Sequence, residues 1–265
     1  MAKIIRKGHQ LEQEYYAIKQ EQADNRTKNI RTLCKATFAF FMIYVAAIMV
    51  SVITGTFSIA FLPLTVCLVF ALLIAVFVCL GDSISKHADE DILVSGMCGE
   101  KITTKVLATL PSDYTVFQNI RVTYGVKKSE IDNIVVGRSG VFIVEVKNHN
   151  GHIVGDLKDL YWTQHKVGRG GTPYTNKVYN PVKQVGTHIY CLANYLRQNG
   201  VNTYIEGMVY FVNKSCLVSL TGESAISVYV SSDNDEFGLC RRILSGVHNL
   251  DFENINNICE LINQL

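Results

Sequence analysis

The feature that most constrains this chain is a stretch of 46 residues, Ala36 to Gly81, that contains no Asp, Glu, Lys or Arg. A single helix of that length would extend about 69 Å, more than twice the roughly 30 Å hydrocarbon core of a bilayer. The stretch must therefore fold back on itself, and TGTF around Gly55 is the expected turn. Two membrane spans are predicted, over about 36–54 and 57–80, each close to the roughly 20 residues that a crossing needs.

Basic residues are concentrated before the first predicted span. Residues 1–35 hold eight Lys/Arg and four Asp/Glu, whereas Lys86 alone follows closely after the second span. Because Lys and Arg are enriched on the cytoplasmic side of membrane spans, we expect both termini in the cytoplasm. We therefore predict an integral membrane protein, in the cell inner membrane, with the lipid bilayer as a partner. The alternative, a buried helical hairpin in a soluble protein, fits less well because soluble cores seldom run so far without a charge.

The remaining composition limits the partners. Residues 81–265 carry 17 Lys/Arg and 19 Asp/Glu, which is not the balance of a strongly basic nucleic-acid-binding domain. Locally, residues 121–183 hold ten basic and five acidic residues, whereas residues 215–265 hold two and seven. The eight cysteines include no C-x-x-C pair, so neither a zinc ribbon nor a disulfide framework is indicated.

After the hairpin the pattern is that of a mixed α/β domain. Asn180 as N-cap and Pro181 at the first helical position predict one well-marked helix. The other elements are predicted from apolar periodicity and turn residues: a helix at 98–110, strands at 114–124, 130–136, 141–147, 204–212 and 225–231, and helices at 234–245 and 253–264. The predicted organisation is a polar arm (1–35, helical or disordered), a membrane hairpin (36–81), an α/β domain (82–213) and a C-terminal α/β extension (214–265).

Charged residues interrupt two of these apolar strands. A symmetric hairpin around the turn GRSG pairs Val136 with Val141 and brings Asp132 opposite Glu145. Side chains alternate along a strand, so Lys147 lies on the same face as both carboxylates. Like charges directly opposed across strands are destabilising, which suggests that something lies between them.

A divalent cation would resolve that repulsion. Mg²⁺ prefers oxygen ligands and is often held by one or two carboxylates, with water and phosphate completing the octahedron. Lys147 would then orient the attacking water or neutralise charge on a phosphate. The same register also pairs Glu130 with Lys147 as an ordinary surface ion pair, which explains the lysine but not the opposed carboxylates.

Taken together, these segments resemble a nuclease-related domain (NERD) of the PD-(D/E)xK, or restriction-endonuclease-like, group. The resemblance covers about 97–212. It is carried by GE at 99–100, EIDNIVVGRSGVFIVEVKN at 130–148, Trp162 and NPVKQ at 180–184. Where the broader group often has Pro before the aspartate, this chain has Ile131, as is usual in NERD-like chains.

The resemblance implies a restriction-endonuclease-like core with helices flanking a central mixed sheet. It implies Asp132 and Glu145 as ligands of Mg²⁺ (or Mn²⁺) and Lys147 as the catalytic lysine. Glu100 matches the acidic residue of the first helix and Gln184 the polar residue of the second, both directed at the same site. The membrane hairpin and the tail after about 214 lie outside the resemblance.

Other residues were weighed as sites. His149, His152 and His165 form a candidate zinc cluster without a cysteine or close fourth ligand, and they read better as loop histidines near the cleft. His188 lies one helical turn after Gln184, either facing the substrate or packed. GRGG lacks the Lys-Ser/Thr of a P-loop and reads as a flexible loop. Exposed bases of a nucleic acid could stack on the aromatic residues around that loop, between its lysines and arginine, although core packing explains Trp162 equally well.

Three functions follow from this sequence. The first is a membrane-anchored, Mg²⁺-dependent nuclease that hydrolyses nucleic acid at the cytoplasmic face. The second is a catalytically inactive, nuclease-like membrane adaptor that binds nucleic acid or a protein partner. The third, a two-span regulatory subunit of a membrane complex, has only the short hairpin in its favour.

Overall fold

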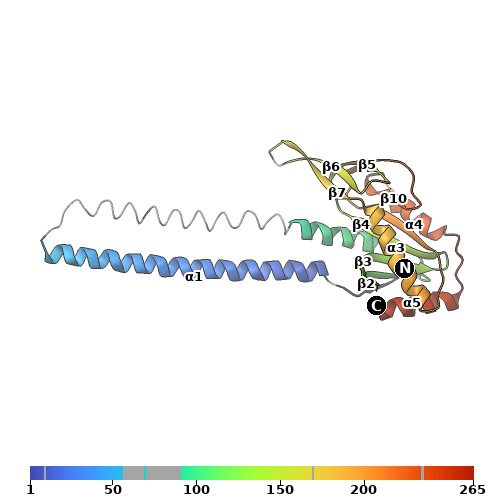
Figure 1. The fold of residues 1–265 in the computed structure, drawn as a ribbon, viewed down its shortest axis with the longest axis horizontal. Helices are drawn as coiled ribbons and strands as arrows, with labels where there is room; N and C mark the ends of the chain where they lie inside the picture. The colour runs from blue at the N-terminus through green and yellow to red at the C-terminus, as the bar shows by residue number, and fades with distance from the viewer. Residues whose placement is uncertain (9, 56–68, 70–90, 169, 234–235) are drawn as a thin grey trace. The chain divides into compact units, whose positions relative to one another are not determined.

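A computed structural model describes residues 1–8, 10–55, 69, 91–168, 170–233 and 236–265 of the chain (Figure 1). The chain divides into two compact units, one formed by Met1–Gln10 with Ser95–Leu265 and the other by Leu11–Val94. The first unit is a mixed α/β domain, which confirms the predicted fold class.

Helix α1 (Gln10–Ile53) is the long described element of the second unit. It ends where the sequence predicts the turn, and Gly55 there has a φ of 65°. One 18-residue window of the helix has a mean hydropathy of 2.4 and is 6% buried, and among the described residues this is the one helix long and apolar enough to cross a membrane. The predicted second span, 57–80, lies outside the described residues except for residue 69, so the two-span hairpin stays a prediction.

Residues 1–35, predicted as one polar arm, are divided between two elements. Residues 10–35 are the first part of α1, continuous with its apolar end. Strand β1 (Lys3–Arg6) instead pairs in parallel with β2 (Thr115–Tyr124). The backbone N–H of Lys7 also donates to the carbonyl oxygen of Gln118 at 3.2 Å. The first residues of the chain are therefore an edge strand of the α/β domain.

The central sheet has six strands in the order β1-β2-β3-β4-β8-β10. The strands β2, β3 and β4 are antiparallel neighbours, and the other three join in parallel pairings. Two of the strands, β1 and β10, come from outside the range 82–213. The remaining bounds are β3 (Lys127–Gly137), β4 (Gly140–Lys147), β8 (Ile205–Phe211) and β10 (Ser227–Val230).

Helices cover both faces of this sheet. Helices α3 (Pro181–Gln198) and α5 (Phe252–Gln264) pack on one face, around Ile134 and Ile143. A helix whose described part is 91–107 and α4 (Glu236–Leu244) pack on the other face. Because both faces are covered, β3 and β4 are apolar on both sides, as expected of central strands.

The start of α3 follows the sequence prediction. The side chain of Asn180 accepts a hydrogen bond from the backbone N–H of Val182 at 2.9 Å, and Pro181 occupies the first helical position. The Asn180 amide also donates to the carbonyl oxygens of Leu157 and Asp159 at 3.1 and 2.7 Å. Buried Asn180 therefore holds both the start of α3 and the loop that precedes strand β6 (Tyr161–Val167).

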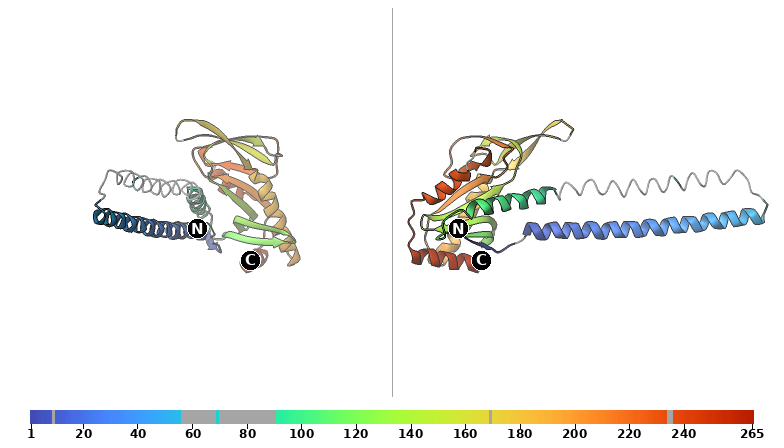
Figure 2. Two further views of the ribbon diagram at one scale, coloured as in Figure 1. Left: turned by 60° about the vertical axis from the view of Figure 1, so that its left-hand side comes forward. Right: turned by 180° about the vertical axis from the view of Figure 1, so that it is seen from behind.

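A second sheet has four strands in the order β7-β6-β5-β9. Its bounds are β5 (Gly151–Asp156), β6 (Tyr161–Val167), β7 (Pro173–Tyr179) and β9 (Cys216–Thr221). The strands β6 and β7 pair antiparallel along their whole length, up to Val167 with Pro173, and GRGG at 168–171, predicted as a loop, lies between them in the chain. The hairpin projects from the rest of the domain in Figures 1 and 2. Trp162 on β6 is buried in the core, as the packing interpretation expected.

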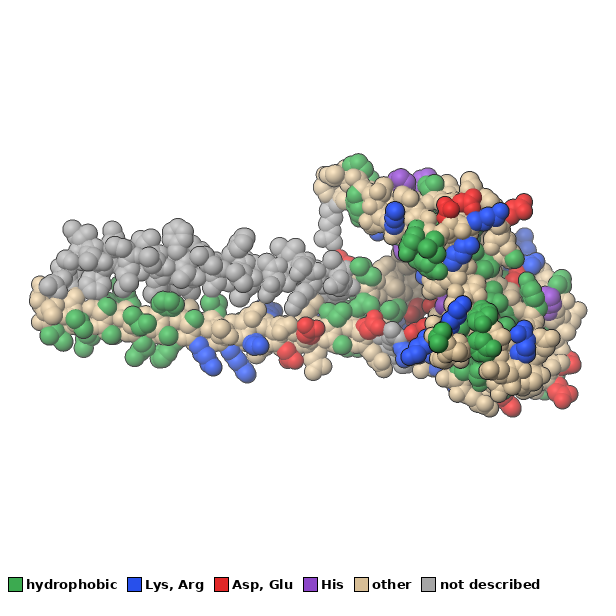
Figure 3. All heavy atoms as spheres, in the orientation of Figure 1, with side chains coloured by type: hydrophobic (Ala, Val, Ile, Leu, Met, Phe, Trp, Pro, Cys, Tyr) green, Lys and Arg blue, Asp and Glu red, His purple; other side chains and the backbone are tan. Residues whose placement is uncertain are grey.

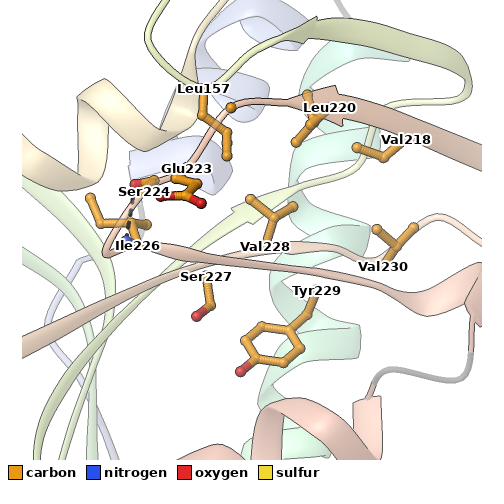
Figure 4. A pocket seen from close by; sticks show the side chains of 11 residues that line it. Leu157, Val218, Leu220, Glu223, Ser224, Ile226, Ser227, Val228, Tyr229 and Val230 are labelled. Atoms are coloured by element: carbon orange, nitrogen blue, oxygen red, sulfur yellow. Dashed lines mark hydrogen bonds between the residues drawn. The ribbon is translucent and has the colours of Figure 1, made fainter.

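The two sheets approach each other at β9 and β10, where they enclose a pocket of about 790 Å³. Figure 4 shows Leu220 and Val228 directed into this space, whereas Ser227 and Tyr229 point to the other side of β10. Glu223 is the one titratable carboxylate among its lining residues. The pocket is therefore an open gap between the sheets, lined by both polar and apolar residues.

Candidate functional site

The β3–β4 hairpin has the predicted register. Val136 pairs with Val141, and the ladder continues to Asn133 with Val144. One step further, where the register brings Asp132 opposite Glu145, the ladder ends. There the Asp132 carboxylate accepts a hydrogen bond from the backbone N–H of Val146 at 2.7 Å. The carboxylate of β3 thus takes the place of a backbone acceptor at the end of the hairpin.

Glu145 lies at the centre of a hydrogen-bonded network between β4 and α3. Lys147 Nζ donates to Glu145 Oε1 at 2.6 Å and to Gln184 Oε1 at 3.0 Å. The other carboxylate oxygen of Glu145 is 3.1 Å from His188 Nε2. The side chain of Glu145 is 2% exposed and that of Lys147 is 22% exposed, so the ammonium group has access to solvent while its partner does not. Three of the five residues predicted for the site, Glu145, Lys147 and Gln184, are therefore in direct contact.

His188 is packed and does not face a substrate. Its Nδ1 hydrogen-bonds with Ser129 Oγ on β3, and its Nε2 with Glu145 on β4. The imidazole thus bridges two strands beneath α3 and orients the glutamate. Of the two readings of this residue from sequence, the packed one is correct.

The charges of this cluster are strongly coupled. Burial and the nearby Glu145 carboxylate raise the pKa of Asp132 well above its usual value. Burial opposes ionisation of Glu145 too, but Lys147 and His188 outweigh it and lower the pKa of Glu145. Burial works against the charge on Lys147, but the two carboxylates more than compensate and raise its pKa. Glu145 and Lys147 are therefore a charged pair, whereas the surroundings of Asp132 disfavour its ionised form.

Protein groups relieve part of the repulsion that suggested a cation. Lys147 and His188 both contact Glu145, and the Asp132 carboxylate accepts the N–H of Val146. The Mg²⁺ site stays a prediction. Glu130, the alternative partner of Lys147, instead pairs with Arg121 on β2 at 3.3 Å.

Glu100 lies on a different side of the sheet from this cluster. Its helix packs on the face opposite α3, and its carboxylate accepts hydrogen bonds from Arg6 at 2.8 Å and Asn119 at 3.3 Å. Its charge is near enough to raise the pKa of Asp132, as the smallest of the contributions. The prediction placed Glu100 and Gln184 at the same site, whereas Gln184 contacts Lys147 and Glu100 is held by the N-terminal strand.

The donor set fits Mg²⁺ in part. Asp132 and Glu145 supply two carboxylates at one sheet end, which suits an ion that retains water and binds substrate phosphate. A carboxylate has about four lone-pair positions, so the hydrogen bonds to Glu145 leave room for a metal ligand. In the part of the chain that the structure describes, no group of three or more His, Cys, Asp or Glu side chains is placed to hold a metal. A metal here would depend on ligands from water and substrate.

The histidine zinc site predicted as an alternative is not formed. His152 and His165 are a cross-strand pair with ring centroids 6.1 Å apart, whereas His149 packs near Phe211 with centroids 6.3 Å apart. Burial, Lys147 and Lys166 lower the pKa of His149 to about 4, so its imidazole is neutral at pH 7.

Sequence reasoning missed two parts of this cluster. Ser129 gave no signal, because a strand serine before a charged residue resembles a surface position. Arg6, which pairs with Glu100, lies more than ninety positions away and in a segment predicted as a separate arm. The spacing of Gln184 and His188 by one helical turn was the available signal for the imidazole, and it placed both residues on the correct face.

Comparison with known proteins supports the class of domain that this fold and cluster suggest. Residues 95–212 match the family model described as "Nuclease-related domain", over nearly the same range as the predicted resemblance. An uncharacterised protein of Bacillus anthracis is 41% identical over 122 residues, which are 44% of this chain and 55% of that protein. The chain therefore spans about half the length of this relative. No solved structure matches.

Proposed function

We propose that the protein is a membrane-anchored, metal-dependent nuclease whose site lies at the end of the β3–β4 hairpin. The nuclease-related domain supports the class of function. The single observation that carries the chemistry is the contact of Lys147 with both Glu145 and Gln184, beside a second, half-buried carboxylate, Asp132. This combination is the one that the PD-(D/E)xK resemblance implies.

The roles follow from the charges of the groups. Asp132 and Glu145 would hold Mg²⁺ or Mn²⁺, and the ion would polarise the phosphodiester and lower the pKa of a bound water. Lys147 has a raised pKa, so it acts as a cation that neutralises phosphate charge, and it is no base at neutral pH. Gln184 and His188 hold Lys147 and Glu145 in position from α3.

The membrane part of the proposal has its main support in α1. Most apolar side chains of its second half are exposed, among them Phe38, Phe41, Ile43, Met49 and Val52. Exposed apolar side chains over most of a helix are typical of a helix surrounded by lipid. We propose two spans in the cell inner membrane, with both termini and the nuclease-related domain in the cytoplasm.

Cleavage of labelled DNA and RNA by the full chain in detergent tests this function. We expect product with Mg²⁺ or Mn²⁺ and none with EDTA. Lys147→Ala should lower the rate by at least about a hundredfold if the lysine neutralises transition-state charge. Lys105→Ala, which changes an exposed lysine on the helix at 91–107, is the matched control. Equal rates for the Lys147 variant and the wild type would refute the assigned role.

A non-catalytic adaptor is the second candidate, and one observation favours it. Both oxygens of Glu145 are already hydrogen-bonded to Lys147 and His188, and the Asp132 carboxylate accepts the N–H of Val146, so protein groups already contact both carboxylates. Mg²⁺ titration separates the two candidates, because an ion that binds the folded state raises its melting temperature. An adaptor of this kind would show no such rise and no cleavage.

A further inference from the structure

The β6–β7 hairpin has an outer end that packs against no other strand. The strand β5 pairs with β6 only from Thr163 to His165, so Lys166 and Val167 lie beyond the last β5 pair. We call residues 166–174 the arm. Its described side chains are well exposed, with Val167 at 71% and Tyr174 at 45%. Such a projection adds little to the core, and its exposed surface needs another explanation.

The arm and its strands have one sign of charge. Residues 161–179 contain three Lys/Arg and no Asp or Glu. Figure 3 agrees: the outer part of the projecting hairpin shows green, blue and purple side chains on the visible face, and the red ones begin nearer the domain. This local charge is unlike the near-neutral composition of residues 81–265, and it is complementary to a polyanion.

A groove of about 550 Å³ lies at the base of the arm. It is lined by Gly151 and His152 of β5 together with His165, Lys166, Tyr174 and Thr175 of the hairpin. The groove therefore combines one exposed aromatic ring with a fixed cation and two imidazoles. Aromatic rings beside cations are what proteins use to hold unpaired bases and the phosphates that join them.

The groove is next to the candidate site. Gln164 Nε2, one residue before His165, donates to the carbonyl oxygen of Asn150 at 2.7 Å, which fixes β6 to the segment that follows Lys147. His149 lies near both Lys147 and Lys166, because the positive charge of each lysine lowers the pKa of its imidazole. A nucleic-acid strand lying in the groove would thus contact Lys166 and could continue toward Lys147.

A bilayer is the other polyanionic surface within reach of this chain, and the tip of the arm argues against it. The turn between β6 and β7 has the sequence GRGGT (168–172), with Gly168 N–H bonded to the Thr172 carbonyl at 2.9 Å. Segments that insert at a membrane interface present Trp, Phe or Leu there. The aromatic ring here lies in the groove and not at the tip.

We propose that this groove binds single-stranded nucleic acid, with Tyr174 stacking on an unpaired base and Lys166 contacting the adjacent phosphate. The inference takes its ligand class from the proposed function, but it concerns binding and needs no hydrolysis. It adds a guiding surface that directs an unpaired strand toward Lys147. Single strands should therefore bind more tightly than duplexes, whose bases are already stacked.

The test measures binding of fluorescein-labelled oligothymidylate, oligouridylate and a DNA duplex to the full chain in neutral detergent. EDTA is present throughout, so cleavage does not contribute. We expect Tyr174→Ala to weaken binding of the single strands by about tenfold, Tyr174→Phe to retain it, and Lys166→Ala to make the affinity less dependent on salt. The matched controls are Tyr179→Ala and Lys177→Ala on the same hairpin outside the groove, where Tyr179 is also 45% exposed.

The outcomes are distinct from those of the cleavage assay. Equal affinities for wild type and Tyr174→Ala, equal losses with the control variants, or tighter binding of the duplex would each overturn the proposal. Hydrogen exchange of the full chain in nanodiscs supplies a readout without substitutions: the oligonucleotide should slow exchange over residues 166–174. If phosphatidylserine slows exchange there and the oligonucleotide does not, the arm contacts lipid and the proposal is wrong. A protein that binds but never cleaves would leave this inference standing and remove the proposed catalysis.

Discussion

Lys147→Met should destabilise the domain by much more than loss of a surface lysine. The substitution removes a cation 2.6 Å from a carboxylate whose side chain is 2% exposed. Removing one partner of a buried ion pair costs about 3–5 kcal/mol, because the other charge is left without compensation. His188 still contacts Glu145, and the lysine side chain is 22% exposed. We therefore expect the free energy of unfolding to fall by about 2–3 kcal/mol, below that range.

Urea unfolding of the full chain in detergent, followed by tryptophan fluorescence, measures this loss. Trp162 is the only tryptophan of the chain and is 1% exposed, so its emission reports on the domain. The double variant Glu145→Gln with Lys147→Met has no buried charge to compensate and should recover stability, with a coupling energy of about 1.5 kcal/mol or more. Lys105→Met, on the exposed surface, should cost no more than about 0.5 kcal/mol.

The pH dependence has a definite sign. In the wild type, folding lowers the pKa of Glu145. Ionised Glu145 therefore stabilises the fold at pH values above its unfolded-state pKa, and this contribution is lost as the pH falls through its folded-state pKa. Without Lys147, burial is the main influence left and favours the protonated acid. Lowering the pH should therefore reduce the difference in free energy of unfolding between Lys147→Met and the wild type. A loss no larger than that of Lys105→Met, or strictly additive effects of the two substitutions, would refute the view that Glu145 depends on Lys147.

Two further predictions concern the same domain. Asp132→Asn should raise the melting temperature at pH 7 in EDTA and abolish any stabilisation by Mg²⁺. Because folding raises the pKa of Asp132, its carboxylate opposes folding once the pH exceeds the pKa of the unfolded state, and the advantage of the variant should disappear toward pH 3. A lower melting temperature of the variant at pH 7 would contradict this. Asn180→Ala should lower the free energy of unfolding by about 2 kcal/mol, since the helix-cap hydrogen bond and the two hydrogen bonds donated by the side-chain amide are lost together. Asn199→Ala, at the exposed end of α3, is the control in the same fluorescence assay. Equal effects of the two substitutions would contradict the capping role.

The sequence was sufficient where a local rule sets the geometry. A two-residue turn defines the β3–β4 register, so Val136 and Val141 could be paired from their positions alone. The Asn180–Pro181 pair marked the start of α3, and helical spacing put Gln184 and His188 on the face that contacts β4. Both predictions depend on residues close in sequence.

The sequence was insufficient where a distant segment decides the outcome. The strand β1 has only four residues, two of them charged, and its pairing with β2 spans more than a hundred positions. Glu100 was expected beside Gln184, but a resemblance does not show that its carboxylate is held by Arg6 from that strand. Register likewise placed Asp132 opposite Glu145 without showing that the Asp132 side chain accepts the N–H of Val146.

The pairing of β1 with β2 has a practical consequence for anyone who wishes to study the domain without lipid. Cutting the chain at residue 82 removes the apolar helix, but it also removes β1 and exposes the unpaired N–H and C=O groups of the longer strand β2, a ready template for aggregation. A tractable soluble version should instead keep residues 1–8 and join them to position 95 by a short flexible linker, so that the short, charged strand β1 remains the edge of the sheet.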